Sequence, residues 1–289
     1  MKISCTPVSV YEELRNKEID QAKYFELISS AGAEATDILD PAAYGCFWQD
    51  FEKEKRLLPG LLKANGLDIS AYATSNNFTV IEPERFTAQV ERVINAARDA
   101  AAFGIGTMRI FGGYHKMLGP EHHMDFSDGL QQVIRGIEEV LPEAEKLGVT
   151  LALENHGRLP GLPEEILYIM KYFDHPNLGL CFDIANFNAF NMNEFVDAVS
   201  AYELLKPYIK HVHCKDWKTS ETTHCNAAAV CGRGNGTVPL RRLAYLMERD
   251  RFPGYWALEY EAGGLGGVTE SIQYMKSLKD AAELLYPAN

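Results

Sequence analysis

Four polar residues that can bind metal ions each stand at the end of a short apolar run: Glu154, Asp183, His213 and Glu259. These runs have the length and composition of β-strands. In a parallel barrel the carboxyl ends of the strands meet around one mouth, so the four side chains would lie close together there. Two glutamates, one aspartate and one histidine form an oxygen-rich set that suits Mn²⁺, Mg²⁺ or Co²⁺, and Zn²⁺ less well. The pattern predicts a site for one divalent metal ion, with Mn²⁺ foremost.

A single acid at the end of a strand is more often ion-paired or solvated, but four such residues on successive strands favour a metal site. The second ring nitrogen of a histidine ligand needs an outer acceptor, and Asp216 is close enough to His213 in sequence to be considered. Glu261 has the same strand parity as Glu259 and is its rival for the last ligand position.

The elements that would position these residues alternate along the chain. Runs with the character of strands cover residues 2–6, 33–38, 68–73, 107–111, 150–154, 178–182, 210–213 and 255–259. Helical spacing of apolar residues covers residues 20–31, 84–103, 126–147, 164–173 and 239–250. Four glycines stand where a helix should end before its strand, namely Gly32, Gly66, Gly104 and Gly148. Alternation of this kind predicts parallel strands with right-handed crossovers, and we expect residues 1–289 to form one domain, a single (β/α)8 TIM barrel.

The chain has 289 residues, 46% of them hydrophobic and 24% charged, and a formal net charge of −12. No stretch approaches the roughly 20 apolar residues that span a bilayer, and the first residues lack the apolar segment of a signal peptide. We therefore expect a cytoplasmic protein without a membrane partner. Nucleic acid is a poor partner for so acidic a chain, because binding a phosphate backbone depends on clustered Lys and Arg. The six cysteines match no disulfide framework and are expected to be reduced thiols.

The chain also resembles a known family over nearly its whole length. The residues that carry the resemblance are the segments 153–157, Leu-Glu-Asn-His-Gly; 181–186, Cys-Phe-Asp-Ile-Ala-Asn; 211–216, His-Val-His-Cys-Lys-Asp; 232–236, Gly-Arg-Gly-Asn-Gly; and 258–261, Leu-Glu-Tyr-Glu. They resemble the sugar phosphate isomerase/epimerase superfamily, whose fold is a xylose isomerase-like TIM barrel. The resemblance implies one divalent metal ion held by Glu154, Asp183, His213 and Glu259. In the ketose 3-epimerases of that family, the glutamates matching Glu154 and Glu259 also exchange a proton with the substrate.

The chemistry of such a site follows from general principles. A proton next to a carbonyl becomes removable when a metal ion polarises the carbonyl oxygen and stabilises the enediolate. Return of the proton to the opposite face gives an epimerase, and return to the neighbouring carbon gives an aldose–ketose isomerase. Loss of a β-hydroxyl instead gives a dehydratase. We expect an enzyme of carbohydrate metabolism acting on a small sugar or polyol, foremost a keto-sugar epimerase; the alternative is a dehydratase of an inosose or of dehydroshikimate.

Three positions depart from the ketose 3-epimerase pattern. Asn186 stands where those epimerases carry a substrate-contacting His, Thr219 stands at the place of an Arg, and Pro160 at the place of an acid. The metal ligands and proton-transfer roles therefore carry over, whereas sugar specificity does not. Asn186 remains a candidate for substrate binding.

Five further residues are candidates for substrate binding. His156 and His115 could contact substrate hydroxyls or support the ligands. Lys215 could pair with a carbonyl, carboxylate or phosphate, although an exposed lysine is the default. Arg233, in a glycine-rich loop, could reach an anionic substrate. Trp48 could pack on a sugar ring, and the alternative is a packed loop or a dimer contact.

Two hypotheses from other classes stay open. An apurinic endonuclease of the same superfamily would need three zinc ions and further His and Asp ligands, and the acidic charge argues against it. A metal-free sugar-binding or regulatory barrel is the other, and metal analysis of the purified protein separates it from an enzyme. A homo-oligomer is compatible with the sequence, which does not fix the number of chains.

Overall fold

Eight short strands form a closed barrel in a computed structural model that describes residues 1–113, 126–157, 159–190, 195–219, 226–234 and 236–287. The strands are β1 (Lys2–Cys5), β2 (Ala35–Leu39), β3 (Asp68–Ala73), β4 (Thr107–Phe111), β5 (Thr150–Glu154), β6 (Leu178–Asp183), β7 (Ile209–Cys214) and β10 (Tyr255–Leu258). Their order around the barrel is β1-β10-β7-β6-β5-β4-β3-β2. The prediction of a (β/α)8 TIM barrel is confirmed. Each strand lies within two residues of its predicted bounds.

The strands read as nearly continuous apolar runs because both of their faces are buried. All five residues of β2 and all six of β6 are buried, including the aspartate in each. An ionisable side chain at such a position has no access to bulk water and needs a partner inside the protein. The strands therefore provide a rigid frame on which a few buried polar groups are placed.

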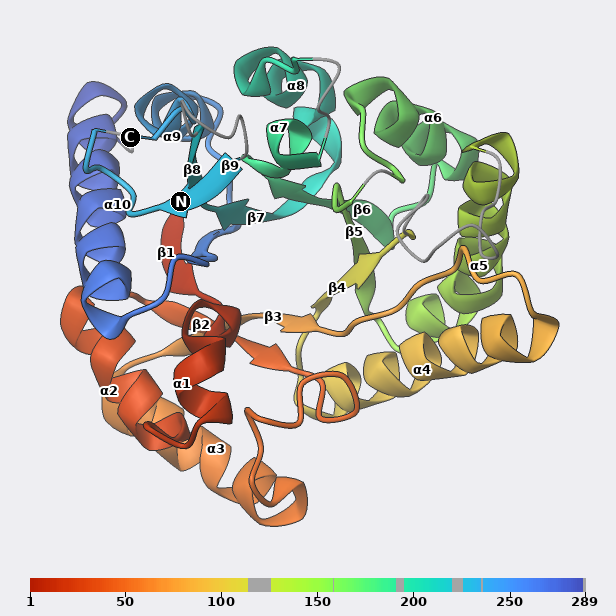
Figure 1. The fold of residues 1–289 in the computed structure, drawn as a ribbon, viewed down its shortest axis with the longest axis horizontal. Helices are drawn as coiled ribbons and strands as arrows, with labels where there is room; N and C mark the ends of the chain where they lie inside the picture. The colour runs from red at the N-terminus through yellow and green to blue at the C-terminus, as the bar shows by residue number, and fades with distance from the viewer. Residues whose placement is uncertain (114–125, 158, 191–194, 220–225, 235, 288–289) are drawn as a thin grey trace. The chain divides into compact units, whose positions relative to one another are not determined.

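The chain divides into two compact units, residues 1–70 with 212–289 and residues 71–211, and the boundaries fall inside β3 and β7. In the first unit β1 pairs in parallel with β10 and with β2. Its helices are α1 (Tyr11–Arg15), α2 (Gln21–Ala31), α3 (Phe51–Asn65), α9 (Leu240–Arg249) and α10 (Leu265–Leu285), with a 3-10 turn at Pro7–Val10. Helix α10 packs against α2 and α9 (Figure 1).

Local signals explain where α2 begins and ends. The Asp20 side chain accepts a hydrogen bond from the backbone N–H of Lys23 at 2.9 Å and so caps the first turn. The helix ends at Gly32, whose φ of +108° lies in the region that glycine adopts without steric cost. The predicted helix boundary at Gly32 is confirmed.

The second unit contains α4 (Pro83–Ala102), α5 (Phe126–Lys146), α6 (Pro163–Phe173), α7 (Asn186–Phe190), α8 (Ala198–Leu205) and a 3-10 turn at Lys206–Tyr208. Strand β4 pairs in parallel with β5, which pairs with β6. Helices α4 and α5 are in contact with each other (Figure 1). The register places Phe111 beside Glu154 and Glu154 beside Cys181, so the ends of these three strands stand at one level.

The sequence analysis did not anticipate a small antiparallel hairpin. Strand β8 (Asp216–Thr219) pairs with β9 (Asn226–Ala229) directly after β7. The hairpin lies in the connection between β7 and α9, which is long for a βα loop. Long βα loops at the carboxyl ends of barrel strands are where TIM barrels build their sites.

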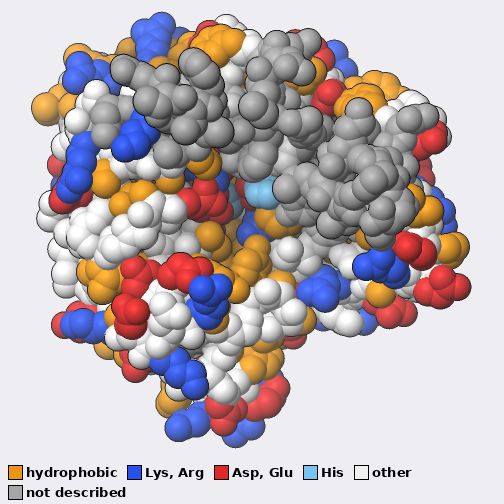
Figure 2. Space-filling model, viewed as in Figure 1, with side chains coloured by type: hydrophobic (Ala, Val, Ile, Leu, Met, Phe, Trp, Pro, Cys, Tyr) orange, Lys and Arg blue, Asp and Glu red, His pale blue; other side chains and the backbone are white. Residues whose placement is uncertain are grey.

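Charged side chains of both signs lie side by side at the lower end of the view in Figure 2, where α3 begins. Lys55 pairs there with Glu52 at 2.7 Å, and both side chains are exposed. Mixed surface charge of this kind does not resemble a phosphate-binding stripe. Within the described ranges, none of the helices has the length and apolar character needed to cross a bilayer.

Candidate metal centre

Glu154 and Asp183 end two neighbouring strands, β5 and β6, and both are fully buried. The Glu154 carboxylate lies 3.2 Å from Nε of Arg109 through Oε2 and accepts a hydrogen bond from Nδ2 of Asn186 at 3.1 Å through Oε1. Oδ1 of Asp183 accepts the backbone N–H groups of Ala185 and Asn186, both at 2.9 Å. Each carboxylate is therefore held in one orientation by donors from the same compact unit, residues 71–211.

Arg109 was missed by the sequence analysis. It lies inside β4 and is 1% exposed, and one of its terminal nitrogens donates to the carbonyl oxygen of Thr74 at 2.6 Å. Its guanidinium carbon also lies 4.1 Å from the ring centroid of Phe111. This planar cation compensates the buried charge of Glu154.

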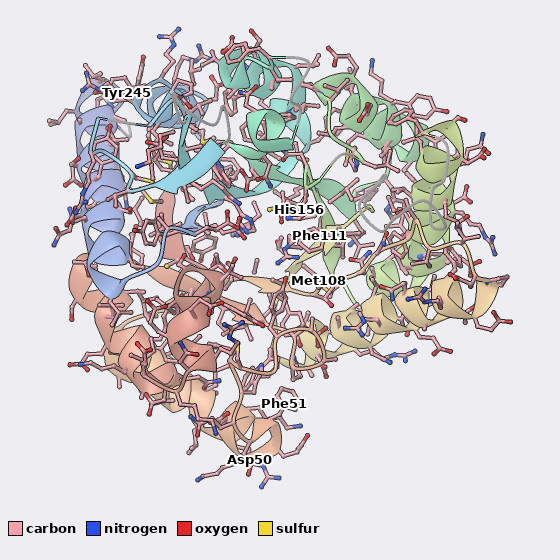
Figure 3. The ribbon with its side chains drawn as sticks, in the orientation of Figure 1. Asp50, Phe51, Met108, Phe111, His156 and Tyr245 are labelled. Atoms are coloured by element: carbon pink, nitrogen blue, oxygen red, sulfur yellow. The ribbon has the colours of Figure 1, made fainter. Side chains whose placement is uncertain are left out.

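His156 lies beside Phe111, as Figure 3 shows, with ring centroids 4.4 Å apart and an interplanar angle of 37°. The preceding residue, Asn155, exchanges two hydrogen bonds of 2.8 Å with the backbone of Asp183. These bonds fix the start of the loop after β5. They place the partly exposed His156 next to the strand end that carries Glu154.

His213 and Glu259 form a second pair of ligand candidates, on β7 and directly after β10. Nδ1 of His213 lies 3.4 Å from Oε2 of Glu259, and Nε2 lies 3.6 Å from Oδ2 of Asp37. The backbone N–H of Glu259 donates to the carbonyl oxygen of Cys214 at 2.9 Å, which ties the end of β10 to β7. His213 is 1% exposed and Glu259 6%.

Lys215 is buried, which contradicts the default expectation of an exposed lysine. Its Nζ lies 2.6 Å from Oε2 of Glu259 and 3.5 Å from Oε2 of Glu261, and its side chain is 4% exposed. Burial by itself would raise the pKa of Glu259, but the charges of Lys215 and His213 outweigh burial and hold that pKa well below its ordinary value. Glu259 is therefore a carboxylate ready to bind a cation, whereas Glu261, at 37% exposure, lies nearer to solvent.

Asp216 does not take the supporting role that the sequence suggested. Its Oδ1 accepts the backbone N–H groups of Trp217 at 2.9 Å and Val238 at 3.2 Å. Its carboxyl group lines a pocket of about 540 Å³ together with Tyr274 and Tyr245, the residue labelled on α9 in Figure 3. Burial raises the pKa of Asp216. The acceptor that faces the second ring nitrogen of His213 is Asp37, which was not considered from the sequence.

The other predicted substrate contacts have partners of their own. Trp48 is 6% exposed, its Nε1 donates to the carbonyl oxygen of Leu39 at 2.6 Å, and its ring packs edge-on against Phe47 and Phe51. This favours the packed-loop alternative. Arg233 is exposed and pairs with both carboxylate oxygens of Glu270 at 2.8 Å.

One predicted site residue, His115, lies outside the described residues. The cysteines in the described part, Cys5, Cys46, Cys181, Cys214 and Cys231, are all free thiols.

Among the described residues, Glu154, Asp183, His213 and Glu259 are one of three groups of buried side chains that could hold a metal ion. The other groups combine His213 with Asp37 and His211, or with Glu154 and Cys181. The group of four offers three carboxylates and one imidazole, a donor set that fits a hard or borderline divalent cation.

A closed (β/α)8 barrel with carboxylate and imidazole side chains at its strand ends defines the broad class to which the protein belongs. The model of the xylose isomerase-like TIM barrel family matches residues 25–278. The chain belongs to this family.

Individual relatives agree with this assignment. The chain is 24% identical over 246 residues to a 3-dehydroshikimate dehydratase of Bacillus anthracis, covering 83% of this chain and 82% of the relative. A solved D-tagatose 3-epimerase-like protein is similar with a TM-score of 0.75 and 19% identity over 99% of both chains. A xylose isomerase-like TIM barrel protein of Mycobacterium smegmatis, solved in complex with magnesium, is similar with a TM-score of 0.72 and 19% identity over 97% of both chains. The likeness to these two solved structures establishes the shared fold.

Proposed function

We propose that this chain is a divalent-metal-dependent isomerase or epimerase that removes a proton next to a carbonyl of a polyhydroxylated substrate. The observation that carries the proposal is the set of four buried residues, Glu154, Asp183, His213 and Glu259, that could hold one ion. Three carboxylates and one imidazole form a donor set that fits a hard or borderline divalent cation, and such an ion can act as a Lewis acid on a substrate oxygen. We propose Mn²⁺ as the native ion, with Mg²⁺, Co²⁺ and Zn²⁺ as alternatives.

In this proposal Glu154 and Glu259 transfer the proton. A bound divalent ion would polarise the substrate carbonyl and make the neighbouring proton acidic. Each glutamate has its own buried cation, Arg109 for Glu154 and Lys215 for Glu259. The glutamate on one face would accept the proton as a carboxylate, and the glutamate on the other face would return a proton as the carboxylic acid. The two cations fix the orientation of these carboxyl groups.

His156, Asn186 and Lys215 are the proposed contacts to substrate hydroxyl and carbonyl oxygens. Asn186 is oriented by its own bonds, since its backbone N–H reaches Asp183 and its Nδ2 reaches Glu154. Because Trp48 and Arg233 are engaged with Leu39 and Glu270, we leave them out of the proposed site.

A dehydratase of a keto-polyol is the second candidate, because one relative over most of the chain is a 3-dehydroshikimate dehydratase. The first step is the same proton removal, and the outcome differs in whether a β-hydroxyl departs. The epimerase remains the main proposal, and the products separate the two.

The test is an assay of the purified protein with Mn²⁺ in deuterated water against a panel of ketoses, keto-inositols and dehydroshikimate, followed by NMR. Deuterium at an inverted carbon supports an epimerase, deuterium at a neighbouring carbon an isomerase, and a new double bond a dehydratase. Glu154→Gln and Glu259→Gln should each lose at least about 100-fold in kcat, the usual contribution of a proton-transfer group. Glu261→Gln is the matched control and should retain turnover. Full activity in both glutamine variants, or in protein stripped of metal, contradicts the proposal.

A further inference from the structure

A line of buried polar groups leads from β1 to His213. Oγ of Ser4 lies 2.6 Å from Oγ of Ser70, and Ser70 donates to Oδ1 of Asp37 at 2.5 Å. Oδ2 of Asp37 then faces Nε2 of His213 at 3.6 Å. Ser4 and Asp37 are fully buried, and Ser70 and His213 are 7% and 1% exposed.

The proton positions along this line follow from the number of donors. Each serine hydroxyl has a single proton, and that of Ser70 goes to Asp37, so the contact between the serines requires Ser4 to donate. The Asp37 carboxylate can only accept. A neutral His213 facing it is therefore stabilised with its proton on Nε2, which leaves the lone pair on Nδ1.

The other ring nitrogen points to the candidate ligands. Nδ1 of His213 lies 3.4 Å from Oε2 of Glu259. A metal ion shared by these residues would need an unprotonated imidazole nitrogen on this side. With a metal ion at Nδ1, the ion and Asp37 favour the same tautomer; without one, the Glu259 carboxylate competes by accepting from Nδ1.

We propose that Asp37, held by Ser70 and Ser4, is a positioning residue that fixes the tautomer and orientation of His213 so that Nδ1 binds the metal ion. This inference rests on the proposed metal site. The present distance of 3.6 Å is longer than a formed hydrogen bond, and metal binding at Nδ1 is expected to shorten it to about 3.0 Å.

The test uses Asp37→Asn, which keeps the side-chain volume. If the amide oxygen continues to accept from Ser70, the amide NH₂ group faces Nε2 and forces the proton of the neutral ring onto Nδ1. The dissociation constant of Mn²⁺, measured by calorimetry, should rise about 10–100-fold. Asp216→Asn is the matched control, because Asp216 is another buried acid near His213 in sequence and is bonded elsewhere. The dissociation constant of Mn²⁺ for this variant should stay within about 3-fold of wild type.

A second measurement reports on the ring without any metal. The ¹⁵N shifts of His213 in metal-free protein at alkaline pH, where imidazole is neutral, should show a larger share of the tautomer with its proton on Nε2 in wild type than in Asp37→Asn, because Asp37 stabilises that tautomer and the amide that replaces its carboxylate does not. A share of this tautomer that is no larger in wild type than in Asp37→Asn, or an unchanged Mn²⁺ affinity in Asp37→Asn, overturns the inference. Wild-type protein that binds no divalent ion contradicts the proposed function instead, and the tautomer still decides the role of Asp37.

Discussion

Replacing Lys215 with Met tests whether the charge of Glu259 is compensated inside the protein. The side chains of Lys215 and Glu259 are 4% and 8% exposed and their charged atoms lie 2.6 Å apart. Removing one partner of a buried ion pair typically costs 3–5 kcal/mol, because the other charge is left in a medium of low polarity. His213, 3.4 Å from the same carboxylate oxygen, supplies part of the compensation, so we expect about 3 kcal/mol in metal-free protein at pH 7.5.

The sign of the pH dependence follows from the pKa of Glu259. In the wild type this pKa lies below its unfolded value, so the group stabilises the fold above the unfolded pKa of about 4.3, and this contribution is lost as pH falls through the folded pKa. In Lys215→Met the charge of Lys215 no longer opposes the effect of burial, so the pKa of Glu259 rises. The Glu259 carboxylate then takes up a proton as the pH falls. The penalty of Lys215→Met should therefore be largest at pH 7.5 and smaller at pH 5.

Urea unfolding of metal-free protein at the two pH values measures this difference. Lys218→Met, on β8 and exposed, is the control and should change stability by no more than about 0.5 kcal/mol. A penalty for Lys215→Met below about 1 kcal/mol, the range of surface ion pairs, or one that is equal at both pH values, would refute the reasoning.

Three further predictions concern packing and metal binding. Gly60→Ala, at a helix position of α3 where an added Cβ meets nothing within 4 Å, should raise the free energy of unfolding by about 1 kcal/mol. Gly179→Ala on β6, where the Cβ would lie 2.7 Å from the carbonyl oxygen of Tyr208, should lower the free energy of unfolding by about 1–3 kcal/mol. Equal effects of the two substitutions would contradict the packing described. Trp48→Phe should lower stability by about 1–3 kcal/mol by leaving a buried carbonyl oxygen without its donor, with KM unchanged in the assay; a large rise in KM would return Trp48 to the substrate site. Mn²⁺ at 100 times its dissociation constant should stabilise the protein by about 2.7 kcal/mol in thermal unfolding, and Asp183→Asn should lose most of this gain.

The strand and helix pattern could be predicted from the sequence because each barrel strand is a short apolar run and several of the connecting helices carry a strong apolar period. The end of α2 could be predicted from Gly32, because the backbone there adopts a positive φ that glycine tolerates best. The β8–β9 hairpin could not be predicted in this way. Its strands have four residues each, Asp216–Thr219 and Asn226–Ala229, and are too short to show an alternation of apolar and polar residues.

The residues around the candidate ligands were harder to anticipate. Arg109 and Asp37 are charged residues inside apolar strands, and this was a usable signal, because a charge in the middle of a barrel strand has to be paired. Lys215 gave no such signal, since its burial depends on Glu259, a residue 44 positions later in the chain. Asp216 and Asp37 could not be ranked as partners of His213 without knowing which strand pairs bring their side chains together.

The most direct test of the proposed metal site is anomalous diffraction at the manganese absorption edge from crystals grown with Mn²⁺. The account predicts one anomalous peak per chain with Glu154, Asp183, His213 and Glu259 as ligands at about 2.0–2.3 Å, and with Nδ1 as the ligating atom of the histidine. An anomalous peak bound by other residues would contradict the account. So would the absence of a peak at these four residues in protein that turns over substrate.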